Sequence, residues 1–184
     1  MIEGNQTITV WTGHYLSMVM RGRWEYVTRH TGKPAVGIVP VTDAGRVVLV
    51  EQYRTPVCQR VVELPAGLAG DLPGAEEESL LQTAKRELLE ETGYSAHAWT
   101  ELATGYSSPG LTDESIVLFL AEGLEKVGPG GGDSNESIQV HEVALDYVLP
   151  WLAEHGQKAD LKLLAGLYAA LQYRLERGAN GFQS

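Results

Sequence analysis

The sequence has almost no cysteine, no long hydrophobic run and a deficit of positive charge. Its one cysteine, Cys58, excludes an intramolecular disulfide and a zinc site built from several cysteines. No segment has the roughly 20 consecutive apolar residues that span a bilayer, and the start, MIEGNQTITVW, lacks a basic stretch followed by an apolar one. We therefore expect a cytoplasmic protein without a membrane partner.

The charge balance bears on the possible partners. The chain has 14 basic and 24 acidic residues, giving a net charge of −10. Such a surface repels a nucleic-acid backbone, so we expect no nucleic-acid partner. A phosphorylated small molecule is still compatible with this charge, because metal ions neutralise it locally. The 184 residues fit one domain, residues 1–184, with a sizeable core.

Several segments have the composition of strands. Residues 15–20 and 24–30 flank Arg21-Gly22-Arg23, and residues 35–42 and 46–53 flank Asp43-Ala44-Gly45, so we expect two hairpins. Further strands are expected at residues 7–11, 97–106, 115–121 and 137–145, and a glycine-rich loop at residues 128–135.

Two segments have helical periodicity. The first, residues 75–92, ends at Gly93, and its expected buried stripe is Leu80, Leu81, Ala84, Leu88 and Leu89. The second, residues 159–176, has an expected buried face of Leu161, Leu164, Ala165, Tyr168 and Leu171. Strands and helices together predict an α/β fold, a mixed sheet with helices against it.

The stretch KRELLEETGY, residues 85–94, places three carboxylates close together on the first helix. Glu87, Glu90 and Glu91 stand at i, i+3 and i+4, where each like-charged pair costs roughly 0.2–0.5 kcal/mol. Two interpretations are open from this spacing alone. The residues form either a solvated acidic face or a site completed by a divalent cation such as Mg²⁺, which takes oxygen ligands and substrate phosphates.

The wider pattern resembles the Nudix box, which is Gly, five residues, Glu, seven residues, then Arg-Glu-aliphatic-any-Glu-Glu-any-Gly-aliphatic. Residues 86–94, RELLEETGY, match its second half apart from Tyr94 at the last apolar place. The glycine that corresponds to its start is Gly67, and ten residues separate it from Glu78 instead of five. Three adjacent residues are therefore candidates for the first acidic place: Glu76, Glu77 and Glu78.

Three further segments are similar to the ADP-ribose and nucleoside-diphosphate-sugar pyrophosphatase branch of the Nudix hydrolases. They are VEQYR at 50–54, ELPAGL at 63–68 and SPGLTDE at 108–114, and Pro109 lies fifteen residues beyond Tyr94. The resemblance implies an α/β/α sandwich with a mixed sheet. It also implies an antiparallel strand segment, about residues 1–33, that joins two copies in a homodimer, and a catalytic core at about 34–184.

The resemblance also implies the roles of individual residues. Mg²⁺ or Mn²⁺ would bind the carboxylates of Glu87, Glu90 and Glu91 and the carbonyl of Ala66. Arg86, Glu90 and the loop residue Glu136 would be catalytic, with Glu136 acting as general base or as metal ligand. The implied substrate-binding residues are Trp24, Arg54, Glu63, Pro109 and Glu114.

Three of these substrate residues also have an ordinary structural interpretation. Trp24 is compatible with a strand core, Arg54 with a surface ion pair and Pro109 with a turn. With the resemblance, we expect Mg²⁺-dependent hydrolysis of ADP-ribose or a related nucleoside diphosphate sugar to a nucleoside monophosphate and a sugar phosphate. The alternatives are a preference for GDP-mannose or UDP-glucose, or a domain that senses a nucleotide without cleaving it.

Overall fold

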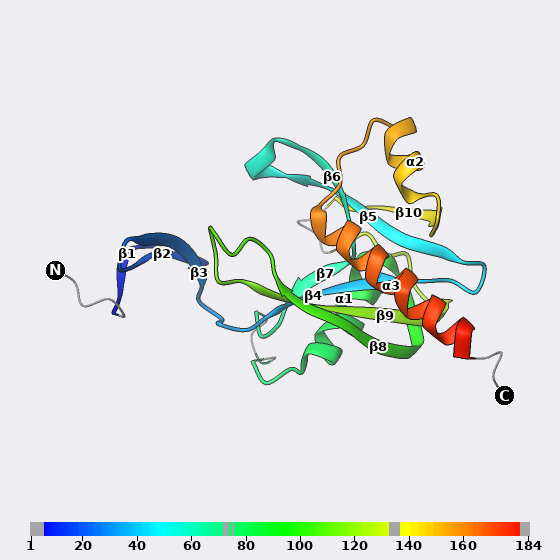
Figure 1. Cartoon of the computed structure of the whole chain (residues 1–184), viewed down its shortest axis with the longest axis horizontal. Coiled ribbons are helices and arrows are strands. Elements are labelled where there is room, and N and C mark those ends of the chain that lie inside the picture. Colours follow the sequence, from blue (N-terminus) through cyan, green and yellow to red (C-terminus); the bar gives the residue numbers. More distant parts are fainter. Residues whose placement is uncertain (1–5, 72–73, 75, 133–136, 181–184) are drawn as a thin grey trace.

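The chain begins with a three-stranded antiparallel sheet that stands apart from the rest of the molecule (Figure 1). The structure, a computed structural model, describes residues 6–71, 74, 76–132 and 137–180. The sheet contains β1 (Thr7–Thr12), β2 (Leu16–Arg21) and β3 (Trp24–Arg29). The predicted hairpin at Arg21-Gly22-Arg23 is confirmed: Arg21 pairs with Trp24, and Gly22 has φ = 61°, a conformation that glycine adopts without strain.

A four-stranded sheet forms the centre of the remaining chain. Its order is β7 (Ala66–Leu68), β4 (Ala35–Pro40), β9 (Ser115–Lys126) and β8 (Tyr94–Tyr106). β4 and β9 run parallel, while the β4–β7 and β8–β9 pairs are antiparallel. The expectation of a mixed sheet is therefore confirmed.

A second sheet has the order β10 (Gln139–Ala144), β5 (Arg46–Arg54) and β6 (Gln59–Glu63), and a short 3-10 turn, Thr55–Val57, joins β5 to β6. The predicted hairpin of residues 35–42 with 46–53 is wrong beyond its turn. The Thr42 amide donates to the Arg46 carbonyl at 2.8 Å and Val41 bridges Val47, but β4 and β5 then part into different sheets. Both strands are buried on both faces, so each packs between its own neighbours instead of against the other.

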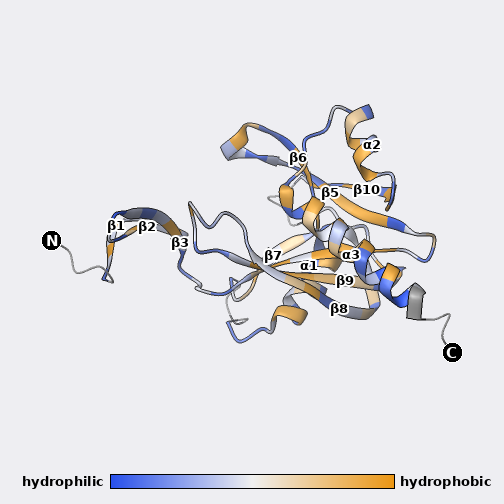
Figure 2. Ribbon diagram, in the orientation of Figure 1, coloured by the Kyte–Doolittle hydropathy of each residue, from blue (hydrophilic) through white to orange (hydrophobic). Residues whose placement is uncertain are grey.

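Helices cover both faces of the four-stranded sheet. On one face, α1 (Leu80–Thr92) places Ala84 and Leu88 against strand residues such as Ile38 and Phe119. The other face packs with the second sheet, α2 (Val148–Glu154) and α3 (Leu161–Asn180) in a larger core. The strands β5 and β9 at this centre are largely hydrophobic (Figure 2). The helix–sheet–helix layering agrees with the expected α/β/α sandwich.

The first helix is shorter than predicted. It begins at Leu80 and not near residue 75, because Ser79 and Gln82 form a capping box: the Ser79 hydroxyl accepts from the Gln82 amide and the Gln82 side chain accepts from the Ser79 amide. Two leucines of the predicted buried stripe, Leu81 and Leu89, are exposed at 36% and 44%.

The last helix buries the opposite face from the one predicted. Leu161, Leu164, Tyr168 and Leu171 are exposed, whereas the buried residues are Leu163, Gly166, Leu167 and Ala170. Both stripes are apolar, so periodicity could not choose between them. Gly166 decides the choice, since a Cβ there would lie 2.6 Å from a Leu64 methyl carbon. The missing side chain lets α3 approach the sheet closely.

In the part of the chain that the structure describes, no helix has both the length and the apolar character needed to cross a membrane.

Candidate active site

The three carboxylates near the end of α1 occupy different environments. The Glu87 and Glu91 side chains are largely buried, whereas that of Glu90 is half exposed. The Glu91 carboxylate accepts a hydrogen bond from the Ala66 amide at 3.0 Å. Next to it, Gly67 leaves room for Glu87, since a Cβ on Gly67 would lie 2.0 Å from a Glu87 carboxylate oxygen. Thus β7 and α1 bring ELPAGL and the acidic helix into contact.

Arg86 is the cation at the centre of this acidic group. Its guanidinium donates to Glu87 at 2.8 Å and to Glu90 at 3.0 Å, and it lies 3.7 Å from Asp71. It also contacts Glu78 at 3.4 Å, so Glu78, and not Glu76 or Glu77, joins the described network. Burial alone would lower the pKa of Arg86, but the surrounding carboxylates raise it above its ordinary value.

The electrostatics of Glu87 favour a bound cation. Burial raises its pKa from 4.5 to about 7, even though Arg86 opposes the shift, and the nearby Glu90 and Asp71 add to it. At neutral pH this carboxyl is therefore only partly ionised although Arg86 contacts it, and a bound divalent ion would favour its charged form.

Among the described residues, no three acidic or histidine side chains are gathered into a ready metal site. The Arg86 contacts explain this arrangement, because they hold the Glu87 and Glu90 carboxylates around the guanidinium. The potential ligand atoms nevertheless suit a hard divalent ion, which prefers oxygen ligands. A carboxylate of α1, that of Glu91, lies against the backbone of Ala66. Glu87, Glu90, Glu91 and the Ala66 carbonyl could hold such an ion.

A cavity of about 360 Å³ lies beside these carboxylates. Its lining contains Arg54, which forms a two-pronged ion pair with the buried Glu63: Nε to Oε1 at 2.5 Å and Nη2 to Oε2 at 2.8 Å. The hydrogen bonds to Glu63 raise the pKa of Arg54, so its charge is secure. The cavity is thus lined by carboxylates and by a guanidinium whose orientation an ion pair fixes. Its lining includes Arg29, Arg54, Glu63, Ala66, Gly67, Asp71, Glu87, Glu91, Glu114 and Lys162.

Two cations of this cavity were missed in the sequence. Arg29, at the end of β3, donates to Glu114 at 2.5 Å. Lys162 lies in the first turn of α3, where Asp160 accepts from its amide at 2.7 Å and pairs with its ammonium. A lysine near a helix N-terminus opposes the helix dipole, and this was the one available signal for it. Nothing in the sequence pattern marked Arg29.

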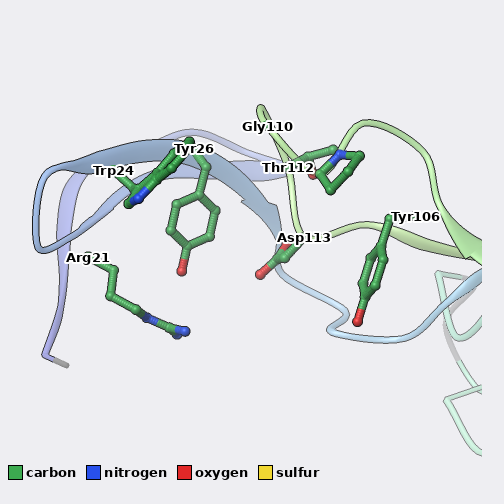
Figure 3. A pocket seen from close by; sticks show the side chains of 8 residues that line it. Arg21, Trp24, Tyr26, Tyr106, Gly110, Thr112 and Asp113 are labelled. Atoms are coloured by element: carbon green, nitrogen blue, oxygen red, sulfur yellow. The ribbon is translucent and has the colours of Figure 1, made fainter.

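A second cavity of about 340 Å³ is aromatic (Figure 3). Trp24 and Tyr26 project from β3, and Tyr106 faces them from the end of β8. Trp24 is 61% exposed, so it is not part of a strand core. Pro109 and Asp113 of the segment after β8 complete the wall, together with Arg21, Gly110 and Thr112.

The two cavities are linked by a third of about 500 Å³. It shares Tyr106 with the aromatic cavity, and Ile116 and Lys162 with the acidic one. The three hollows are therefore neighbours, with the 500 Å³ cavity adjoining both of the others.

The structure separates the sequence-predicted site residues into groups. The acidic cavity contains Arg54, Glu63, Ala66, Glu87, Glu91 and Glu114, and the aromatic cavity contains Trp24 and Pro109. Arg86 and Glu90 contact the acidic group but do not line its cavity. Glu136 lies outside the described residues.

Comparisons with known proteins agree with this architecture. The chain is 36% identical over 151 residues to the methanol dehydrogenase activator of Bacillus methanolicus. The aligned region covers 82% of this chain and 78% of that protein. It is 39% identical over 137 residues to the ADP-ribose pyrophosphatase of Bacillus subtilis, covering 74% and 70% of the two chains. The crystal structure of an ADP compounds hydrolase superposes with a TM-score of 0.74 over 94% of both chains at 22% identity, which shows a shared fold.

The NUDIX domain matches residues 31–164, which include β4 to β10, α1 and both partners of the Arg54–Glu63 pair. This match agrees with the Nudix-box residues on α1 and with the cavity beside that helix. The chain belongs to the NUDIX domain family.

Proposed function

We propose that this protein hydrolyses the diphosphate bond of ADP-ribose or a related nucleoside diphosphate sugar in a Mg²⁺-dependent reaction. The products would be a nucleoside monophosphate and a sugar phosphate, AMP and ribose 5-phosphate from ADP-ribose. The observation that carries this proposal is a cavity lined both by buried carboxylates and by Arg29, Arg54 and Lys162, with an aromatic cavity that adjoins it through a third one.

The cations of the cavity suit a diphosphate. The guanidinium of Arg54 is planar and binds phosphate oxygens in pairs, and Glu63 fixes its orientation. Arg29 and Lys162 add positive charge from two other elements, β3 and α3. Together they would hold the diphosphate beside α1, while the Trp24, Tyr26 and Tyr106 rings would stack with the base.

Nudix hydrolases generally use a divalent metal, and Mg²⁺ or Mn²⁺ would be held by Glu87, Glu90, Glu91 and the Ala66 carbonyl. When bound, the ion would screen the phosphate charge and lower the pKa of a water molecule. The oxygen of water would attack one phosphorus atom, and the bond from that atom to the bridging oxygen would break. We propose that Glu136 accepts the proton of the water; it lies outside the described residues, so this role rests on the family resemblance.

Product analysis tests the activity directly. The protein is incubated with ADP-ribose and Mg²⁺, and the products are separated by chromatography against AMP and ribose 5-phosphate standards. Product formation that stops in excess chelator and returns with Mg²⁺ supports the proposal. Unchanged ADP-ribose, together with saturable binding, would instead favour a nucleotide sensor.

A panel of nucleotide sugars separates the substrate preferences. The aromatic cavity offers stacking, which every base can use, so it does not by itself choose adenine. GDP-mannose and UDP-glucose are therefore tested under the same conditions as ADP-ribose. A kcat/KM for ADP-ribose at least tenfold above the others is expected, and the opposite order would move the assignment to another nucleotide sugar.

We also propose a homodimer joined by the N-terminal sheets, in the cytoplasm. All six residues of β1 are exposed, including the apolar Ile8, Val10 and Trp11 at 62%, and a second copy would cover these side chains. The described hydrogen bonds from this sheet to the rest of the chain come from β3: the Val27 amide donates to the Leu111 carbonyl, Thr28 to Asp113 and Arg29 to Glu114. Sedimentation equilibrium should give twice the chain mass, and a monomer at micromolar concentration would refute the dimer.

A further inference from the structure

One edge of the N-terminal sheet, the strand β3, lies against the segment that follows β8. The Val27 amide of β3 donates to the Leu111 carbonyl at 2.9 Å, and Val27 forms a parallel bridge with Thr112. In a parallel register, the residue after Val27 lies beside the residue after Thr112. The backbone pairing therefore brings Thr28 next to Asp113.

The side chains of Thr28 and Asp113 are in direct contact. The Thr28 hydroxyl donates to Asp113 Oδ2 at 3.0 Å. A carboxylate offers about four acceptor sites, of which this bond occupies one. Asp113 is an exposed residue, so a ligand can reach its carboxylate. Thr28 thus fixes the orientation of Asp113 and leaves acceptor capacity for a ligand.

Asp113 lies between the aromatic rings and the acidic cavity. It lines the aromatic cavity, where Figure 3 shows its side chain between Tyr26 and Tyr106. It also lines a small cavity of about 90 Å³, which shares Arg29 and Glu114 with the acidic cavity. The Asp113 carboxylate is therefore a polar group at the place where the two regions meet.

The residues of β3 follow the same order. Trp24, Tyr26 and Thr28 are two residues apart from one another, so their side chains share one face of the strand. Thr28 lies roughly 7 Å beyond Tyr26 along the strand, and Arg29 is the last residue of β3. The ribose of a nucleoside diphosphate lies between its base and its diphosphate. A base on the rings, with its diphosphate near Arg29, would bring this ribose to Asp113.

We propose that Asp113 binds the 2′- and 3′-hydroxyl groups of the nucleoside ribose, so that the protein selects ribonucleoside diphosphate sugars over their 2′-deoxy counterparts. This inference rests on the proposed function, because the contact is made within that substrate. Ribose hydroxyl groups can donate and an ionised carboxylate only accepts, so the two are complementary. A site that hydrogen-bonds a substrate hydroxyl discriminates against an analogue that lacks it.

The preference between two substrates tests this contact. The kcat and KM are measured with Mg²⁺ on the nucleotide sugar that the wild type turns over fastest, and on its analogue with a 2′-deoxynucleoside. Asp113→Ala removes the carboxylate, and Thr28→Val removes only the hydroxyl that orients it. Glu25→Ala is the matched control, because Glu25 is an exposed acid of the same strand whose side chain points to the opposite face from Trp24.

The expected readout is the ratio of kcat/KM for the ribose substrate to kcat/KM for the deoxy substrate. The wild type should show a ratio of about ten or more. Asp113→Ala should bring the ratio to within about twofold of one, mainly through a higher KM for the ribose substrate. Thr28→Val should lower the ratio part of the way, and Glu25→Ala should keep the wild-type ratio.

The ratio separates a lost contact from a general distortion of the site, because a distortion would slow both substrates equally. An active wild type without a preference for the ribose substrate, or an Asp113→Ala variant with the wild-type ratio, overturns the inference and leaves the proposed function standing. A wild type inactive on every nucleotide sugar overturns the proposed function, and the inference with it. If Asp113→Ala does not fold, the ratio of Thr28→Val decides, and an unchanged ratio there overturns the inference.

Discussion

The substitution Glu87→Gln should stabilise the metal-free protein at alkaline pH. The Glu87 carboxyl has a pKa of about 7 in the folded chain and 4.5 as its ordinary value, a difference of about 2.5 pKa units. At 1.36 kcal/mol per unit, ionising this buried group costs the folded state about 3 kcal/mol. Glutamine keeps an oxygen that can accept from Arg86 and removes the charge.

The sign of the pH dependence follows from the direction of the shift. Between pH 4.5 and 7 the folded protein holds a proton on Glu87 that the unfolded chain has already lost. The free energy of unfolding of the wild type should therefore fall as pH rises through this window. The Glu87→Gln variant should lack this fall, so the two proteins should differ by about 1–3 kcal/mol at pH 8 and converge near pH 5.

Urea unfolding in the presence of chelator measures this difference. Glu90→Gln is the matched control, because Glu90 belongs to the same Arg86 network but its side chain is 50% exposed, so its free energy of unfolding should stay within about 0.5 kcal/mol of the wild type. The reasoning about burial is refuted if Glu87→Gln destabilises the protein equally at pH 5 and pH 8.

The remaining predictions concern catalysis and binding. Trp24→Ala should raise KM by a factor equivalent to the roughly 1–3 kcal/mol of a lost aromatic–base stack, with kcat less affected. As a control, Tyr168→Ala, which removes an exposed aromatic ring on α3, should leave KM unchanged. Gly67→Ala should displace Glu87 and weaken Mg²⁺ binding measured by calorimetry, whereas Gly110→Ala, with nothing within 4 Å of the added Cβ, should leave it intact; equal Mg²⁺ affinities would contradict the placement of Glu87. Glu136→Gln should lower the single-turnover rate at saturating Mg²⁺ and substrate far more than it weakens binding, and a rate near that of the wild type would place the base elsewhere.

The helix with the acidic cluster was predictable in its identity but not in its contacts. Its spacing and its stop at Gly93 are local properties, and the structure has both. The pairing of Arg86 with Glu78, and the exposure of Leu89, depend on which face of the helix meets the sheet. That face is chosen by residues distant in sequence, so a periodic pattern could not reveal it.

The same limit explains the errors at α3 and at the turn between β4 and β5. An apolar stripe exists on two faces of α3, and only the close approach at Gly166 selects one. The turn at Asp43-Ala44-Gly45 was recognised from its residues, but strands buried on both faces do not indicate which neighbour they pair with. Arg29 and Lys162 enter the acidic cavity for similarly non-local reasons.

The short segment from Tyr106 to Ile116 has a consequence for how this protein could evolve. Tyr106, Pro109 and Asp113 form part of the aromatic wall, whereas Glu114 and Ile116 border the acidic cavity only a few residues later. An insertion or deletion in this stretch would move both walls at once. New base preferences should therefore arise more readily by substitutions on β3, at positions such as Trp24 and Tyr26, which change one wall and leave the diphosphate chemistry intact.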